Sequence, residues 1–416
     1  MGFRITGRKT CLVAIGLFTF LTTPSAAQNW TRFRGKNGAG ISEQKGIPVT
    51  WSPGDYAWNV ALPGVGHSSP VIWNDKLFLT SAVDRGAVRY LFCLNARTGR
   101  QIWARAIGLN RSHKHKKNSW ASSTPTVDGE RVYVAFADKE SYLLAAYDME
   151  GNLVWRRNLG SFESQHGQGV SPIVFEDLVI IPDDQDGPSS IIAVNRRTGK
   201  TVWSTLRSVR RTSYATPLVL RRPGKTPQLI CASGAMGVTS LDPQTGRLNW
   251  YTGEFPLRTV ASPILADGLI ISSCGGGGIG KLLIAVDPNG HGDVSKTNIR
   301  WQRNRTLPYV PTPVAYRGHI FLWDDNGVVS CLETATGRNI WTKRIGGNFS
   351  GSPICIDGKL YIMNEQGDVV VIAASPRYRF FGKTPLGDPS HATPAIADGR
   401  LYLRTYHRVF CLRTRP

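Results

Sequence analysis

The chain has 416 residues, of which 50 are Lys or Arg and 29 are Asp or Glu, so its formal net charge is +21. Gly and Pro are frequent, with 44 and 25 residues, while 41% of the chain is hydrophobic and 10% is aromatic. This composition excludes a disordered chain, a coiled coil and a collagen-like rod, and it favours many short β-strands joined by tight turns.

The first 27 residues have the features of a secretory signal peptide. A basic start (Arg4, Arg8 and Lys9) is followed by an apolar run over 11–21 and by small residues at 24–27. Because the run is too short to cross a bilayer, we expect cleavage near Ala27 and a soluble exported protein, periplasmic or associated with the cell envelope. Removing the three bases lowers the net charge from +21 to about +18. The alternative is an uncleaved membrane anchor; a lipoprotein signal would need a Cys directly after the cleavage point, and Cys11 lies inside the apolar run.

Residues 28–57 form an N-terminal extension, and residues 58–416 carry an internal repeat that we interpret as one domain. A Ser-Pro or Thr-Pro pair followed by an apolar strand occurs eight times at intervals of 40 to 55 residues, which is typical of four-stranded propeller blades. Most copies continue with a tight turn and a second strand. The copies are at Pro70, Pro125, Pro172, Pro217, Pro263, Pro313, Pro353 and Pro394.

A second pattern ends most copies: an acid or amide, then Thr-Gly, three further residues and Trp, as from Asn195 to Trp203. The Thr-Gly pair supplies the turn between the third and fourth strands, and the Trp begins the fourth strand, where its large face can fill the space between blades. In the seventh copy, Phe380 and Phe381 replace the Trp. We assign a structural docking role, rather than base stacking or sugar binding, to Trp58, Trp103, Trp155, Trp203, Trp250, Trp301 and Trp341.

The last copy ends near Leu412 without a Thr-Gly turn or a Trp, and the segment over 58–62 has the missing fourth-strand pattern. We therefore predict an all-β fold, an eight-bladed β-propeller of four-stranded antiparallel blades. The ring is closed by the N-terminal strand, which removes the open edges of the first and last sheets.

Six cysteines follow the signal segment, and an exported protein could pair them in disulfides. Cys93, Cys331 and Cys411 occupy one register near the end of an apolar strand, where other copies carry Ala, Ser or Val. Because small packing residues replace them, we expect buried free thiols. The chain has no Cys-x-x-Cys motif, so we expect no structural zinc site.

The Thr-Gly-x-x-x-Trp repeat resembles the PQQ-binding-like β-propeller repeat over roughly residues 58–416. The segment over 30–38, with the sequence WTRFRGKNG, is similar to the lead-in of exported bacterial members of this group. The family contains quinoprotein alcohol dehydrogenases and the propeller of outer-membrane protein assembly. The resemblance thus implies a scaffold, and the function has to be argued from the loops.

The loops that lead into the first strands, and those between the second and third strands, are expected to open on one face around a central funnel. This funnel face is the predicted ligand-binding site, because polar, aromatic and cationic groups converge there. The candidate residues are His67, Asn118, His166, Asp183, Asp184, Tyr214, Arg258, Tyr309, Asp324, Asp325 and His391.

Each group of candidates has a structural alternative. The histidines could bind a metal or act as general bases, or each could simply bond a neighbouring loop. The acidic run over 183–187 offers oxygen ligands for Ca²⁺, but it lacks the spacing of an EF-hand loop. These Asp residues could instead stabilise turns or caps. We interpret the basic segment over 113–117 as a solvated loop and the glycines over 275–278 as a close approach of two backbones. No metal site is predicted.

We predict an exported non-catalytic scaffold that binds a protein or envelope ligand through its funnel face, similar to the assembly-factor branch of the family. The alternative is a PQQ- and Ca²⁺-dependent alcohol or sugar dehydrogenase. That resemblance implies Ca²⁺ held by carboxylate and amide oxygens and often a disulfide between adjacent cysteines, and this chain has no adjacent pair.

A third reading is a propeller that binds an anionic polysaccharide, which the net charge favours. We expect a monomer, no bound cofactor in the scaffold reading, and no nucleic-acid partner for an exported protein. The basic clusters that suggest the third reading are Arg207, Arg210, Arg211, Arg221 and Arg222, and Arg404, Arg408, Arg413 and Arg415.

Overall fold

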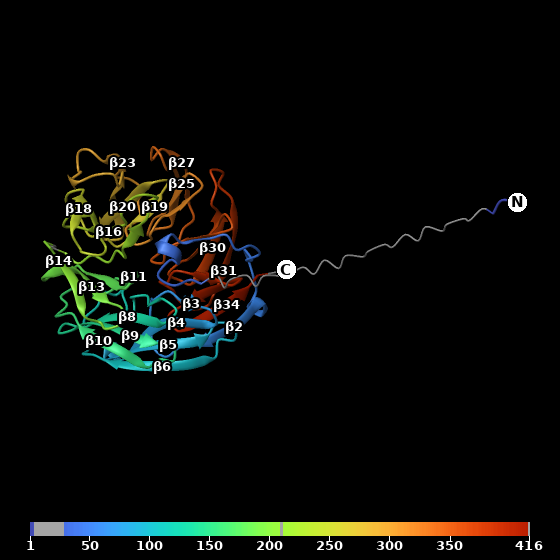
Figure 1. Ribbon diagram of the computed structural model, residues 1–416, viewed down its shortest axis with the longest axis horizontal. Helices are drawn as coiled ribbons and strands as arrows, with labels where there is room; N and C mark the ends of the chain where they lie inside the picture. The colour runs from blue at the N-terminus through green and yellow to red at the C-terminus, as the bar shows by residue number, and fades with distance from the viewer. Residues whose placement is uncertain (4–28, 209–210, 415–416) are drawn as a thin grey trace.

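The computed structural model describes residues 1–3, 29–208 and 211–414. The predicted signal peptide, apart from its first three residues, therefore lies outside the described residues. The strands form eight antiparallel sheets arranged as the blades of one ring (Figure 1), so the predicted eight-bladed propeller is confirmed. Among the described residues, no helix combines the length and the apolarity needed to span a bilayer.

The first four blades follow each other along the chain, and the strands of each run in order from the innermost to the outermost. Blade 1 consists of β3 (Val71–Trp73), β4 (Lys76–Val83), β5 (Val88–Asn95) and β6 (Gln101–Gly108). Blade 2 consists of β7 (Thr126–Val127), β8 (Arg131–Ala137), β9 (Tyr142–Asp148) and β10 (Leu153–Asn158). Blade 3 consists of β11 (Ile173–Phe175), β12 (Leu178–Asp183), β13 (Ser189–Asn195) and β14 (Thr201–Arg207). Blade 4 consists of β15 (Leu218–Leu220), β16 (Gln228–Ser233), β17 (Gly237–Leu241) and β18 (Leu248–Tyr251), to which β22 (Gly292–Asp293) adds in parallel.

The other four blades complete the ring. Blade 5 consists of β19 (Ile264–Ala266), β20 (Leu269–Gly276), β21 (Ile279–Val286) and β23 (Ile299–Arg303). Blade 6 consists of β24 (Val314–Tyr316), β25 (His319–Trp323), β26 (Val328–Glu333) and β27 (Asn339–Arg344). Blade 7 consists of β28 (Ile354–Ile356), β29 (Lys359–Met363), β30 (Asp368–Ala373) and β31 (Phe380–Pro385). Blade 8 consists of β32 (Ala395–Ala397), β33 (Arg400–Arg404), β34 (Arg408–Arg413) and β2 (Tyr56–Ala61). The three short 3₁₀ turns are η1 (Lys36–Gly38), η2 (Pro53–Asp55) and η3 (Asp84–Gly86).

The ring is closed by a strand from the N-terminal part of the chain, which joins the last blade. β2 pairs antiparallel with β34, placing Trp58 opposite Cys411 and Val60 opposite Val409. The N-terminal strand therefore supplies the outer strand of blade 8, as the sequence predicts. The six cysteines of the described chain are buried free thiols that pack within the blades.

A ring of hydroxyl groups joins the innermost strands. The Ser or Thr before each repeated Pro donates its backbone N–H to the side-chain hydroxyl of the corresponding residue in the next blade, at 2.9–3.4 Å. We call these residues the hydroxyl ring: Ser69, Thr124, Ser171, Thr216, Ser262, Thr312, Ser352 and Thr393. The Pro contributes no N–H of its own, so the preceding Ser or Thr carries the contact between blades.

A second set of contacts joins neighbouring blades near their outer edges. Trp155 of blade 2 donates its indole N–H to the Arg196 carbonyl in the Thr-Gly turn of blade 3, at 2.9 Å. The turn residue Gly199 has φ +69°, and a Cβ there would lie 2.8 Å from the Trp155 ring, so the turn needs both the conformation and the smallness of Gly. The same bond to the next blade is made by Trp58, Trp103, Trp203, Trp301 and Trp341. Trp250 instead donates to Gln228 Oε1 in its own blade.

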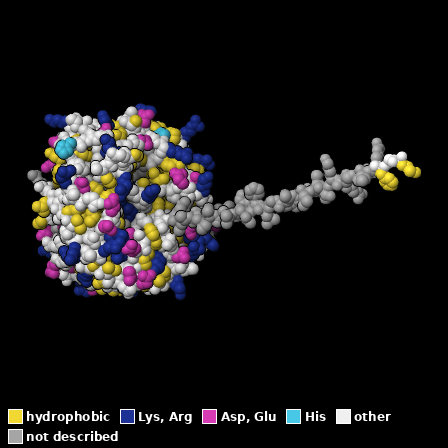
Figure 2. Space-filling model, viewed as in Figure 1, with side chains coloured by type: hydrophobic (Ala, Val, Ile, Leu, Met, Phe, Trp, Pro, Cys, Tyr) yellow, Lys and Arg dark blue, Asp and Glu magenta, His cyan; other side chains and the backbone are white. Residues whose placement is uncertain are grey.

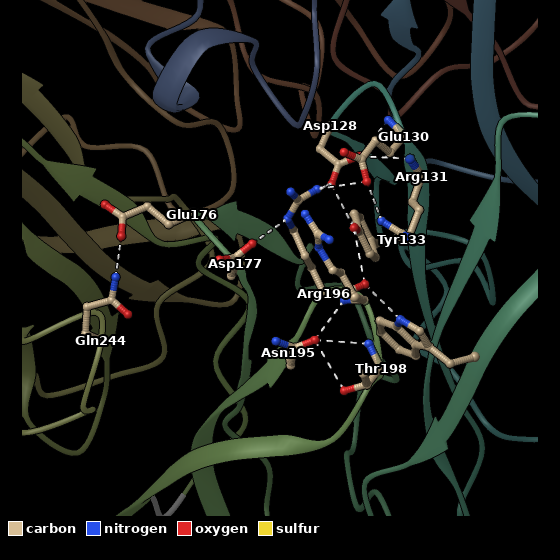
Figure 3. A network of polar contacts seen from close by, with 12 residues as sticks. Asp128, Glu130, Arg131, Tyr133, Glu176, Asp177, Asn195, Arg196, Thr198 and Gln244 are labelled. Carbon is tan, nitrogen blue, oxygen red and sulfur yellow. Dashed lines mark hydrogen bonds and ion pairs between the residues drawn. The ribbon is translucent and has the colours of Figure 1, made fainter.

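Ion pairs reinforce the junction of blades 2 and 3. Figure 3 shows the Arg196 guanidinium between Asp128 of one blade and Asp177 of the other, at 2.8 Å and 3.2 Å. Tyr133 donates its hydroxyl to the same Asp128 carboxylate at 2.8 Å. One arginine thus joins two blades on the face where the Thr-Gly turns lie.

The N-terminal extension crosses the central channel, where its blue segment lies in Figure 1. Trp30 pairs with Ile72 of blade 1, and β1 (Ile41–Ser42) pairs in parallel with the innermost strand of blade 7. Between them, Arg32 donates to the Pro217 carbonyl, and Asn37 makes two hydrogen bonds with the backbone of Val219 in blade 4.

Arg34 lies at the centre of this crossing. It is fully buried, and its Nη2 donates to the carbonyls of Pro313 and Pro353 at 2.7 Å and 3.3 Å. The extension therefore plugs the channel with side chains that bond the backbone of blades 4, 6 and 7.

Candidate functional site

A cavity of about 540 Å³ opens at the centre of one face of the propeller. Residues from all eight blades line it, from the loops that lead into the first strands and from the loops between the second and third strands. Of the eleven residues predicted from the sequence, eight line this funnel: His67, Asn118, His166, Tyr214, Arg258, Tyr309, Asp325 and His391.

The floor of the funnel comes from two features of the channel. Phe33 of the N-terminal plug lines it, as does every member of the hydroxyl ring. An aromatic ring surrounded by hydroxyl groups therefore closes the funnel from below.

A strap formed by residues 109–118, between β6 and blade 2, spans part of the mouth. On one side, the His115 backbone N–H donates to the His166 carbonyl in blade 3 at 3.1 Å. On the other, Lys117 Nζ pairs with Glu365 of blade 7 at 2.8 Å, and the Lys117 carbonyl lies 3.1 Å from His391 Nδ1 in blade 8. The basic segment over 113–117 is therefore tied to three blades, while Lys116 and Lys117 remain exposed to solvent.

His391 belongs to an ordered group at the junction of blades 8 and 1. Because the Lys117 carbonyl can only accept, His391 Nδ1 donates to it, and His391 Nε2 then accepts the Tyr406 hydroxyl at 3.1 Å. The His67 ring lies 4.6 Å from His391 and 5.0 Å from Tyr406, centroid to centroid. Burial lowers the pKa of His391, and burial, helped by the nearby charge of Arg404, lowers the pKa of His67 well below its usual value. Both imidazoles are therefore neutral at neutral pH.

A second histidine pair lies under the strap. The rings of His115 and His166 are 4.9 Å apart, and His166 also contacts Tyr214 edge-on at 6.3 Å. Burial, followed by the nearby charge of Arg258, lowers the pKa of His166 to about 4. His166 Nδ1 is buried and has no hydrogen-bond partner in the described chain.

Asp325 is the carboxylate that lines the funnel in the described chain. It is 3% exposed, and its oxygens accept the backbone N–H groups of Tyr309 at 2.8 Å and Val310 at 3.3 Å. Burial raises its pKa to about 6 despite these bonds. The Asn118 amide is also occupied: it donates to the carbonyls of His166 and Gln168 and accepts from Ser119 and Ser122.

Three predicted residues do not line the funnel. Asp184 is buried between blades and pairs with Arg207 at 3.2 Å, while Asp183 accepts a hydrogen bond from Gln185 at 3.0 Å. Asp324 lies beside the mouth and accepts the backbone N–H groups of its own turn, at Asn326 and Val328. An Asp at the end of a second strand can turn toward the channel or toward the next blade, and a buried arginine decides the direction for Asp184.

Several described members of the basic clusters are not free on the surface. Arg207 and Arg404 are buried between strands, and Arg221 pairs with Glu176 at 3.4 Å. Arg210 and Arg415 lie outside the described residues. On the face seen in Figure 2, dark-blue Lys and Arg side chains are interspersed with magenta Asp and Glu. Among the described residues, the clusters therefore expose less positive charge than the sequence suggests.

The donor set of the funnel does not fit a Ca²⁺-bound quinone. Such a site needs several carboxylate and amide oxygens that can turn toward one ion. The oxygens of Asp325 already accept backbone N–H groups, and the Asn118 oxygen accepts two donors. The described residues include no group of three or more His, Cys, Asp or Glu side chains placed to hold a metal.

Three parts of the site are missing from the sequence prediction: Phe33, the strap and the hydroxyl ring. The strap has a signal in the sequence, because the interval from Pro70 to Pro125 is the longest of the repeat. The hydroxyl ring is also visible as the residue before each Pro, but its role requires the ring geometry. Phe33 belongs to the lead-in segment, which no repeat pattern places in the channel.

Comparison with known proteins identifies the family. The chain is 23% identical over 334 residues to the outer membrane protein assembly factor BamB of Yersinia pestis, covering 74% of this chain and 76% of that protein. Its fold is similar to the crystal structure of BamB from Moraxella catarrhalis, with a TM-score of 0.59, 14% identity, and coverage of 86% of this chain and 97% of that one.

The quinohemoprotein alcohol dehydrogenase of Comamonas testosteroni has the same fold, with a TM-score of 0.66, 13% identity, and coverage of 93% and 80%. At such identities the two structures show the fold alone. The family described as outer membrane protein assembly factor BamB matches residues 49–273 and 280–377. The chain therefore belongs to this BamB family of propellers.

Proposed function

We propose that this protein is an exported, non-catalytic propeller scaffold that presents its funnel face to a protein of the cell envelope. The observation that carries the proposal is the convergence of loops from all eight blades on one face, over a plugged channel. A plugged channel cannot pass a ligand through the ring, so recognition is confined to the rim and the cavity. Membership of the BamB family and the name of the Yersinia pestis relative support the same reading.

The chemistry of the funnel favours a scaffold over an enzyme. Asp325 is bonded to backbone N–H groups, and Lys117 is paired with Glu365, so these two charged groups already serve the structure. The neutral His391 is held between a carbonyl and a hydroxyl. Neither Asp325 nor Lys117 is therefore paired with a nucleophile that it could activate.

Site-specific photocrosslinking in the bacterium of origin tests the docking face. Crosslinkers would replace Lys116 and Asn326, which are exposed at the funnel mouth, and, as controls, Lys200 and Arg247, which are exposed on the face of the Thr-Gly turns. We expect the two rim positions to capture an outer-membrane assembly protein and the two control positions to capture none. Capture from the control face alone would overturn the proposed docking surface.

The export and the enzymatic alternative have their own tests. N-terminal sequencing of the protein from the periplasmic fraction is expected to begin close to residue 28. Calorimetric titration of the mature protein with PQQ, with and without Ca²⁺, is expected to give no Ca²⁺-dependent heat. Stoichiometric Ca²⁺-dependent binding would restore the dehydrogenase reading.

A further inference from the structure

We propose that the funnel is also a binding site for a small organic anion that carries carboxylate or phosphate groups. This inference goes beyond the scaffold function and does not depend on a protein partner. It follows from the hydrogen-bond donors on the floor, from the buried positive charges beneath them and from the bases on the rim.

The hydroxyl groups of the ring line the cavity and can donate hydrogen bonds to a ligand there. Each hydroxyl oxygen accepts a backbone N–H from the preceding blade, and each lines the funnel. A hydroxyl group also has one proton to donate, and within the described chain none of the eight has a protein acceptor for it. A hydroxyl that accepts a hydrogen bond becomes a better donor, so the floor favours an acceptor-rich ligand.

Three buried arginines lie directly against this ring. Arg32 and Arg34 donate to the carbonyls of prolines that follow ring members, and Arg404 donates to Ser68, the neighbour of Ser69. No carboxylate in the described residues lies within ion-pair distance of them, and the Nε of each is buried without a partner. Burial lowers the pKa of Arg34 to about 9, so the guanidinium remains charged at neutral pH.

Buried charges without counterions are costly, and an anion above the floor offsets part of that cost. Lys116 adds positive charge at the rim, whereas the lining carboxylate, Asp325, is occupied by backbone N–H groups. Arg258 also lines the rim, where its Nη2 donates to Gln165 at 3.1 Å and lies 3.9 Å from Asp186. Arg258 Nε is also buried without a partner in the described chain. Ligand pockets commonly have volumes of roughly 300–1,000 Å³, so the cavity of about 540 Å³ has room for an anion of the size of citrate.

Isothermal titration calorimetry of the mature protein with citrate and, separately, with inorganic pyrophosphate tests the proposal. The buffer contains 150 mM NaCl, because screening at that ionic strength removes most long-range attraction to the surface. We expect one site per chain for at least one probe and no heat with the neutral triethyl ester of citrate. Binding of citrate alone assigns carboxylate chemistry to the site, and binding of pyrophosphate alone assigns phosphate chemistry.

Matched variants locate the site. Arg258→Gln is expected to weaken binding at least five-fold, and Thr216→Val, which removes one ring hydroxyl at nearly constant shape, at least three-fold. Lys200→Gln, on the opposite face, is expected to bind as the wild type does. Circular dichroism verifies that each variant is folded, and Arg258→Gln keeps the test valid if Thr216→Val does not fold. Absence of heat with both probes at millimolar concentration, or equal affinity in Arg258→Gln and Lys200→Gln, overturns the proposal.

Discussion

The backbone N–H of Thr393 donates to the hydroxyl of Ser69 at 3.2 Å, across 324 positions of sequence. This bond closes the hydroxyl ring on the inside, as the pairing of β2 with β34 closes the sheets on the outside. Blades 8 and 1 are thus joined at both edges. The Ser-Pro and Thr-Pro pairs that mark the repeat are therefore contacts between blades as well as starts of strands.

The Ser69→Ala variant tests the inner closure. It leaves the buried N–H of Thr393 without its acceptor, which is expected to lower the free energy of unfolding by about 1–3 kcal/mol. Urea denaturation followed by tryptophan fluorescence measures the change. Ser161→Ala, at an exposed serine, is the control and is expected to change stability by less than about 0.5 kcal/mol. Equal stability of the two variants would show that the ring contributes nothing to closure.

The Gly199→Ala variant tests the docking of Trp155. The added Cβ has to enter a left-handed turn at φ +69° and meets the indole ring at 2.8 Å, so we expect a loss of about 2–4 kcal/mol. Gly108→Ala is the matched control, since a Cβ there meets nothing within 4 Å. Thermal denaturation of both variants separates the close approach from a general effect of replacing Gly. A near-neutral Gly199→Ala would contradict the role assigned to this turn.

The stability of the protein is expected to depend on pH through Asp183. Burial, with the neighbouring Asp184 charge, raises its pKa to about 7, above the value of about 3.9 for an unfolded chain. The folded state therefore binds the proton more tightly, so this contribution is complete below pH 4 and is lost as the pH rises through 7. Asp183→Asn removes the titration. Its free energy of unfolding relative to the wild type is expected to increase by about 2 kcal/mol between pH 5 and pH 8. A constant difference between the two proteins across that range would refute the assignment.

The strap is expected to loosen when its ion pair is removed. The pair between Lys117 and Glu365 is partly exposed, so its loss should cost less than about 1 kcal/mol and leave global stability unchanged. Lys117→Gln is nevertheless expected to accelerate amide hydrogen exchange over residues 109–118 about two- to five-fold. Lys116→Gln, a neighbouring exposed lysine of the same strap, is the control. Identical exchange in both variants would mean that the pair does not hold the strap.

The repeat made most of the fold predictable. Two recurring signals, the Ser/Thr-Pro pair and the Thr-Gly turn before Trp, predicted the number of blades, and the missing strand after Leu412 predicted the closure. The same register placed residues such as His67 and Arg258 on the rim, because the residues just before each Pro all face one end of the channel. The repeat therefore predicts where a residue lies around the ring and along the axis of the channel.

Contacts outside the repeat were not predictable in this way. The direction of Asp184 depends on Arg207, which lies on β14 of the same blade. The role of Lys117, between blades 1 and 2, depends on Glu365 of blade 7. Phe33 precedes the repeat altogether. Each of these depends on a pairing between residues that are distant in sequence and follow no period.

The crossing of the channel by the N-terminal extension also constrains how the chain can fold. Arg34 is made early in synthesis, but two of its acceptors, Pro313 and Pro353, come from the last third of the chain. Its guanidinium therefore stays in water until blades 6 and 7 exist. Bringing together segments so far apart has a large loop-closure cost, which slows folding. The residues of the extension are thus made early and are among the last to reach their final place. We expect a chain cut short before blade 7 to leave Arg34 without its acceptors.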